Sequence, residues 1–120
     1  MKKIIIVDDS TVLRTTIQNA LDSAGYDVIG TAEGSKALYA MLEEGNIPNL
    51  ILLDMFFPDE NGIDILKTLK EKYPKIKILV ITGMNQEALN KEVKRCGADD
   101  ILYKPFDMED LTFAMQKLSL

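Results

Sequence analysis

The sequence contains no histidine and no tryptophan, and it has a single cysteine, Cys96, among its 120 residues. Without an imidazole group, the protein cannot store a phosphoryl group on histidine. One cysteine cannot form an internal disulfide, so the composition favours a reducing, cytoplasmic setting. The chain also lacks any apolar stretch near the ~20 residues that a membrane-spanning helix needs, and no signal-peptide core follows Met1.

Positive charge is in short supply as well. The chain has 14 Lys and Arg against 19 Asp and Glu, which gives a formal net charge of -5. Because no basic cluster is present, we expect no direct contact with nucleic acid and none with an anionic membrane. The absence of a G-x-G-x-x-G motif and of a P-loop argues against a dinucleotide-binding enzyme and a P-loop protein. With 47% hydrophobic residues, residues 1–120 are expected to form one globular domain.

Apolar runs alternate with helical patterns along the whole chain. We expect helices that begin near residues 11, 34, 62, 86 and 107, and strands at residues 3–7, 27–31, 50–53, 77–81 and 100–103. An unbroken run such as Ile4–Val7 is typical of a strand buried on both faces of a parallel sheet. The alternation predicts an α/β fold, a five-stranded parallel sheet with helices on both faces. We expect the flavodoxin-like strand order 2-1-3-4-5, which places the first and third strands side by side.

Aspartates follow these two predicted neighbours. Asp8 and Asp9 come directly after the first strand, and Asp54 follows the third. Because parallel strands end at the same edge of a sheet, we expect the three carboxylates to lie close together there. Carboxylates at short range repel one another unless a proton or a cation lies among them, and hard oxygen ligands suit Mg²⁺. The sequence therefore predicts a magnesium site.

Two later strand ends add other groups to the same edge. Thr82 follows the fourth strand and Lys104 follows the fifth. Acids, a hydroxyl and an ammonium group together fit the transfer of a phosphoryl group onto a carboxylate. Asp54 would be the nucleophile, and Asp8 and Asp9 would hold Mg²⁺. Lys104 would pair with a phosphoryl oxygen and Thr82 would donate a hydrogen bond to another. The proline after Lys104 invites a cis peptide bond.

At these strand ends, four segments in order resemble the response-regulator receiver domain of two-component signalling, of the single-domain, chemotaxis-regulator-like kind. They are Val7-Asp8-Asp9-Ser10, Asp54 with the stretch from Met55 to Gly62, Thr82-Gly83, and Lys104-Pro105-Phe106. The resemblance covers essentially the whole chain. It implies a signalling switch that takes its phosphoryl group from a histidine kinase. It also implies slow hydrolysis of its own aspartyl phosphate and no other enzymatic activity.

The resemblance also implies a role for each matching position. The Mg²⁺ ligands would be the side chains of Asp9 and Asp54 with the backbone carbonyl of Phe56, and Asp8 would reach the metal through water. Thr82 matches the family's switch hydroxyl and Lys104 its phosphate-binding lysine. Asp54 would be the phospho-acceptor.

One position departs from the family pattern. Ile101 stands three residues before the lysine, where such domains usually carry an aromatic ring that rotates when the threonine moves. Isoleucine is stiff at χ1 and has no hydroxyl, so we expect the backbone of the Thr82-Gly83 loop to carry more of the signal. Phe56 and Met84 would flank the phosphoryl group, where apolar side chains either pack in the loop or hinder the hydrolytic water.

The output surface is expected on the fourth helix, fifth strand and fifth helix. Phe113 lies off the apolar stripe of the last helix and should face outward beside Ile101, either packed on a neighbour or as a contact for a downstream protein or a phosphorylation-dependent dimer. We interpret the Asp59-Glu60 pair as part of a solvated loop without a functional role.

Two alternative functions remain open: the receiver portion of a longer regulator with a DNA-binding or catalytic output domain, and a phosphorylation-independent scaffold. The lack of a linker after the last helix favours the single-domain form, and chemotaxis is a guess from that form.

Overall fold

The computed structural model describes residues 2–120 and contains one sheet of five parallel strands in the order β2-β1-β3-β4-β5. The fold class and the strand order predicted from the sequence are confirmed. The strands are β1 (Lys3–Val7), β2 (Asp27–Ala32), β3 (Leu50–Asp54), β4 (Lys77–Thr82) and β5 (Asp100–Tyr103). The helices are α1 (Thr11–Ser23), α2 (Ser35–Glu43), α3 (Gly62–Lys72), α4 (Glu87–Arg95) and α5 (Met108–Lys117).

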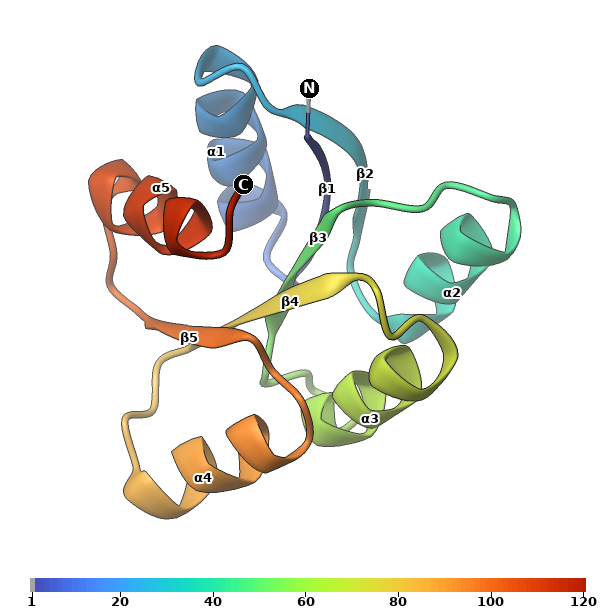
Figure 1. The fold of residues 1–120 in the computed structure, drawn as a ribbon, viewed down its shortest axis with the longest axis vertical. Coiled ribbons are helices and arrows are strands. Elements are labelled where there is room, and N and C mark those ends of the chain that lie inside the picture. The colour runs from blue at the N-terminus through green and yellow to red at the C-terminus, as the bar shows by residue number, and fades with distance from the viewer. Residues whose placement is uncertain (1) are drawn as a thin grey trace.

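Helices cover both faces of the sheet (Figure 1). Helices α1 and α5 lie on one face, and α2, α3 and α4 lie on the other. Successive residues of a strand point to opposite faces, and this divides the core in two. In β1, for example, Ile4 and Ile6 belong to the cluster beneath α1 and α5, while Ile5 and Val7 belong to the cluster beneath the other three helices. Since both faces are covered, the central strands are apolar between their end residues, as the unbroken runs predicted.

Local signals set the helix ends. The Ser10 hydroxyl accepts a hydrogen bond from the backbone N–H of Leu13 and caps α1. Asp107 caps α5 in a reciprocal capping box with Asp110. Gly25 and Gly97 follow α1 and α4 with φ of +90° and +105°, a backbone conformation that glycine adopts without steric cost. None of the helices in the described part of the chain is long and apolar enough to span a membrane.

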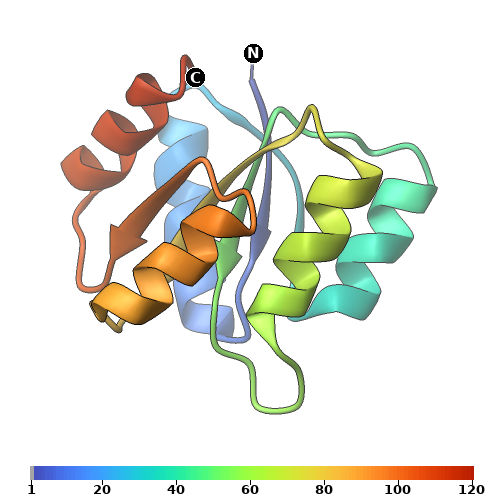
Figure 2. The same ribbon diagram turned by 60° about the horizontal axis from the view of Figure 1, so that its bottom comes forward.

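The parallel register brings the functional strand ends together. Val7 pairs with Leu53, which places the residues after β1 beside the end of β3. Thr82 pairs with Tyr103 in the same way, at the ends of β4 and β5. Figure 2 shows the strands running toward one edge, with the loop between β3 and α3 projecting beyond it. The carboxyl-end edge is therefore where chemistry is expected.

Candidate functional site

Three carboxylates meet at the carboxyl-end edge of the sheet. Asp8, Asp9 and Asp54 each offer an oxygen, and these atoms lie within 4.8 Å of one another. Asp8 is 3% exposed and Asp54 is 5% exposed, whereas Asp9 is open to solvent. The arrangement is therefore a buried pair of acids with a third at its entrance.

The loop after β1 is held in place from two sides. Oδ1 of Asp8 accepts a hydrogen bond of 2.8 Å from the backbone N–H of Ser10. Arg14, on the first turns of α1, donates from Nη1 to the backbone carbonyl of Asp8 at 2.6 Å and from Nη2 to Thr11 Oγ1 at 3.2 Å. The role of Arg14 could not be predicted from the sequence, because an arginine on a helix carries no signal of which carbonyl it will reach.

Each oxygen of Asp54 has its own partner. Oδ1 accepts hydrogen bonds from the backbone N–H groups of Met55, at 2.8 Å, and Phe56, at 3.5 Å. Oδ2 lies 3.4 Å from Nζ of Lys104, and the same ammonium group lies 3.4 Å from Oδ2 of Asp8. One cation is thus shared between two buried anions. The Lys104-Pro105 peptide bond is cis.

The site is electrostatically suited to a further cation. Burial raises the pKa of Asp54, and the neighbouring Asp8 carboxylate raises it further; Lys104 and the two backbone N–H groups offset only part of this. A carboxylate with a raised pKa, beside two more carboxylates, gains from any positive charge that enters. The donors are all hard oxygens, as Mg²⁺ prefers, so the residues present fit this ion.

Thr82 stands across the site at the end of β4. Its side chain is 1% exposed, and its Oγ1 accepts a hydrogen bond of 3.1 Å from the backbone N–H of Met84. The backbone carbonyl of Thr82 accepts from the N–H of Lys104 at 2.8 Å. The hydroxyl and the ammonium group therefore sit on adjoining strand ends, and the hydroxyl is tied to the loop that leads into α4.

Two apolar side chains are exposed at the rim of this edge. Phe56 is 47% exposed and Met84 is 38% exposed. They follow Asp54 and Thr82 by two residues each, so they flank the site from the ends of two neighbouring strands. Because both side chains are exposed, packing in the core does not explain why these two positions are apolar.

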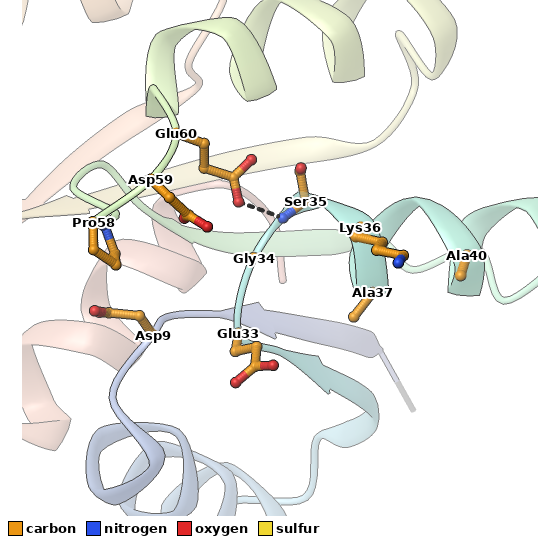
Figure 3. Close-up of a pocket in the computed structure, with 10 residues that line it drawn as sticks. All are labelled: Asp9, Glu33, Gly34, Ser35, Lys36, Ala37, Ala40, Pro58, Asp59 and Glu60. Atoms are coloured by element: carbon orange, nitrogen blue, oxygen red, sulfur yellow. Dashed lines mark hydrogen bonds between the residues drawn. The ribbon is translucent and has the colours of Figure 1, made fainter.

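An acidic groove of about 800 Å³ opens beside Asp9, between the loops that precede α2 and α3 (Figure 3). Glu60 does not behave as a purely solvated loop residue, contrary to the interpretation of the Asp59-Glu60 pair. Its carboxylate is half-buried and Oε2 accepts a hydrogen bond of 2.9 Å from the backbone N–H of Ser35. That interpretation holds only for the exposed Asp59.

The expected output surface contains one exposed aromatic side chain. Phe113 on α5 is 63% exposed, as its position off the apolar stripe predicted, and Nζ of Lys117 lies 5.3 Å from the centre of its ring. Ile101 is half-buried and packs against the core cluster on the side of α2, α3 and α4. It therefore contributes to the core as well as to the surface of β5.

Comparisons with known proteins agree with this geometry. Residues 4–116 match the response regulator receiver domain family. The chain is 32% identical to the chemotaxis protein CheY of Thermotoga maritima over 98% of both sequences. It is 34% identical to sporulation initiation phosphotransferase F of Bacillus subtilis, over 97% of this chain and 92% of that protein. A CheY-like receiver domain from Methanospirillum hungatei superposes with a TM-score of 0.90 at 28% identity, over 98% of this chain and 93% of that one.

Proposed function

The chain belongs to the response regulator receiver domain family, and from that membership we propose that it is a phospho-accepting switch whose phosphorylated residue is Asp54. The donor would be the phosphohistidine of a histidine kinase. The observation that carries this proposal is the pairing of Asp54 with Asp8 around one ammonium group, at the end of two neighbouring buried strands. A purely structural aspartate would gain nothing from a second buried carboxylate at this distance.

We propose a task for each side chain, and the geometry supports each assignment. Oδ2 of Asp54 is the oxygen that lacks a backbone donor, so we assign the attack on phosphorus to it. The new P–O bond forms as the P–N bond of the donor breaks, and the electron pair of the P–N bond returns to the imidazole of the donor. Lys104, already 3.4 Å from this oxygen, would pair with a phosphoryl oxygen, and the Thr82 hydroxyl would donate to another.

A cation site completes the arrangement. Asp9 and Asp54, with the backbone carbonyl of Phe56, would hold Mg²⁺ directly, and Asp8 would act through water. When bound, Mg²⁺ would neutralise the acids and withdraw charge from the phosphoryl oxygens. The raised pKa of Asp54, caused by burial and by Asp8, supports this assignment because an added positive charge would favour the ionised carboxylate.

A downstream protein would detect phosphorylation at a surface away from the site. We propose that phosphorylation shifts an equilibrium between two arrangements of α4, β5 and α5, and that a downstream protein reads the difference through a surface that includes Ile101 and Phe113. The exposure of Phe113 supports a contact there. The protein would be a monomer or a phosphorylation-dependent dimer in the cytoplasm. Residues 1–120 would form a single receiver domain, which the end-to-end match to the Thermotoga protein supports.

Intact mass spectrometry after incubation with acetyl phosphate and Mg²⁺ tests the proposal. We expect one added phosphoryl group, and none in the Asp54→Asn variant or in metal-free wild type. Asp59→Asn, which removes an exposed carboxylate near the site, should still be phosphorylated. The absence of any adduct in folded wild type would refute phosphorylation and leave an interaction scaffold as the remaining function.

A further inference from the structure

The loop between β3 and α3 carries the Phe56 carbonyl and is fastened to another part of the chain by one side chain. Glu60 reaches across the acidic groove, and its Oε2 accepts the 2.9 Å hydrogen bond from the N–H of Ser35, the first residue of α2 (Figure 3). The two residues are 25 positions apart in the sequence. The bond therefore links the loop that precedes α3 to the N-terminus of α2, on opposite sides of the groove.

Helix α2 is built to receive this carboxylate. Its N-cap residue is Gly34, which has no side chain with which to cap the helix. A Cβ atom on Gly34 would lie 2.6 Å from Oε2 of Glu60, closer than such contacts occur. A negative charge at a helix N-terminus is favourable, because it meets unpaired N–H groups and the positive end of the helix dipole. Gly34 thus supplies the room, and Glu60 supplies the cap.

At its other end the same loop is closed next to the cation site. Phe56 and Asn61 form an isolated antiparallel bridge, so the backbone at Phe56 is paired with the residue that follows Glu60. Asn61 in turn caps α3, where its Oδ1 accepts from the N–H of Ile63 at 2.9 Å. A shift of the backbone at Glu60 would therefore act on Asn61 and Phe56, since one peptide bond and one bridge connect the three residues.

We propose that Glu60 is a positioning residue for the cation site, which fixes the Phe56 carbonyl through the Ser35 hydrogen bond. This inference rests on the proposed function, because it requires that the Phe56 carbonyl be a Mg²⁺ ligand. Coupling between two sites is reciprocal. If the bond to Ser35 strengthens Mg²⁺ binding, then Mg²⁺ strengthens the bond to Ser35 by the same factor, and the N-terminus of α2 becomes sensitive to the metal.

Charge must be separated from position in any test. Glu60 shares the groove with other carboxylates, and loss of any of them weakens the attraction for a cation. Asp59 is the matched control, because it is the adjacent residue, lines the same groove and is exposed. Asp59→Asn removes the same charge as Glu60→Gln. Gly34→Ala does the converse: it displaces the Glu60 carboxylate from Ser35 and keeps its charge.

The experiment is a titration of the metal-free protein with MgCl₂ by isothermal calorimetry. We expect Glu60→Ala and Gly34→Ala to weaken Mg²⁺ binding about 5- to 10-fold, the lower end of ordinary coupling between sites. Glu60→Gln keeps an acceptor for the Ser35 N–H, so its affinity should agree with that of Asp59→Asn to within about twofold, as expected of a partly screened surface charge. Hydrogen exchange at the Ser35 amide should slow on addition of Mg²⁺ in wild type and should not respond in Glu60→Ala.

Each contrary result overturns the inference in a different way. If Glu60→Ala weakens binding no more than Asp59→Asn does, and Gly34→Ala has no effect, Glu60 acts by charge alone. If both Ala variants lower the melting temperature but leave Mg²⁺ affinity unchanged, Glu60 caps α2 and does nothing else. If wild type itself shows no Mg²⁺ binding, the proposed function fails, and the positioning role fails with it.

Discussion

Replacing Asp54 with asparagine should stabilise the metal-free protein, although it removes the residue on which the proposed function depends. Asp54 is 5% exposed and lies with Asp8 around one ammonium group. Asparagine has nearly the same shape, and its carbonyl oxygen can still accept the hydrogen bond from the N–H of Met55. The substitution therefore removes charge and leaves the packing in place.

The size of the effect follows from the distances. Two unit charges about 4 Å apart interact by about 4 kcal/mol at an effective dielectric constant near 20. The oxygens of Asp8 and Asp54 lie within 4.8 Å, so their repulsion is of this order. Lys104 lies 3.4 Å from Oδ2 of each acid and offsets a similar amount, so the cost of burying the charge of Asp54 decides the sign. We expect a net gain of about 1–2 kcal/mol, or about 4–8 °C in Tm for a chain of this size.

The gain should depend on pH in a defined direction. Burial and Asp8 raise the pKa of Asp54 in the folded state. Below the ordinary pKa of aspartate, Asp54 is protonated whether the chain is folded or unfolded, and its charge costs nothing. As pH rises from the ordinary pKa of aspartate toward the raised pKa, the unfolded chain loses its proton while the folded chain still holds it, so wild type loses stability relative to Asp54→Asn. Urea unfolding in EDTA should show the gap opening from pH 4 to pH 7.5, and Mg²⁺ should narrow it by stabilising wild type.

Asp100→Asn provides a control of opposite sign. Burial opposes ionisation of Asp100, but the backbone N–H of Ile101 and the ammonium groups of Lys117 and Lys94 outweigh it and lower its pKa. Removal of that charge should destabilise the fold at neutral pH. The difference in stability between Asp100→Asn and wild type should disappear as pH falls through the lowered pKa. If Asp54→Asn is no more stable than wild type in EDTA at pH 7.5, the reasoning about the buried acids is wrong.

Three other substitutions address the remaining roles. Lys104→Met should destabilise the metal-free protein by about 2 kcal/mol in urea unfolding, because it leaves two buried carboxylates without their shared cation; an unchanged midpoint would contradict this. Phe56→Asn should speed loss of the aspartyl phosphate several-fold in a mass-spectrometric time course, since a polar side chain at the rim admits water, and an equal rate would remove that role. Ile101→Ala should keep phosphorylation and should weaken partner binding without abolishing its dependence on phosphorylation; complete loss of phosphorylation-dependent binding would show that the Ile101 side chain carries the signal.

The elements that the sequence predicted well are those governed by local pattern. The run Leu50–Leu53 was recognisable as a strand buried on both faces, and β3 extends it by only one residue, Asp54. The caps at Ser10 and Asp107 depend on equally local chemistry, because each capping residue lies within three positions of its partner. The proximity of the acids followed from parallel strands that end at one edge. All of these depend on short-range chemistry or on topology.

The contacts that were missed join segments whose relative position no local pattern specifies. The bond between Glu60 and Ser35 needs two loops to face each other, and the pair Asp59-Glu60 looks alike in the sequence although only Glu60 is half-buried. Arg14 was missed for a similar reason, because its partner is a backbone carbonyl, which every residue possesses. When a side chain binds a backbone group, the sequence contains no complementary side chain that would reveal the contact.

The contacts of Thr82 indicate how a switch can work without an aromatic ring at position 101. A hydroxyl group can donate one hydrogen bond while it accepts others. Thr82 already accepts the N–H of Met84, so a hydroxyl that turns or moves to donate to a phosphoryl group also displaces its acceptor lone pairs relative to Met84. Met84 belongs to the short loop that leads into α4, a helix with only one buried residue, Val93. A helix held by so little apolar burial should cost little to shift, so in the proposed switch the loop would move α4 without a rotating side chain behind it.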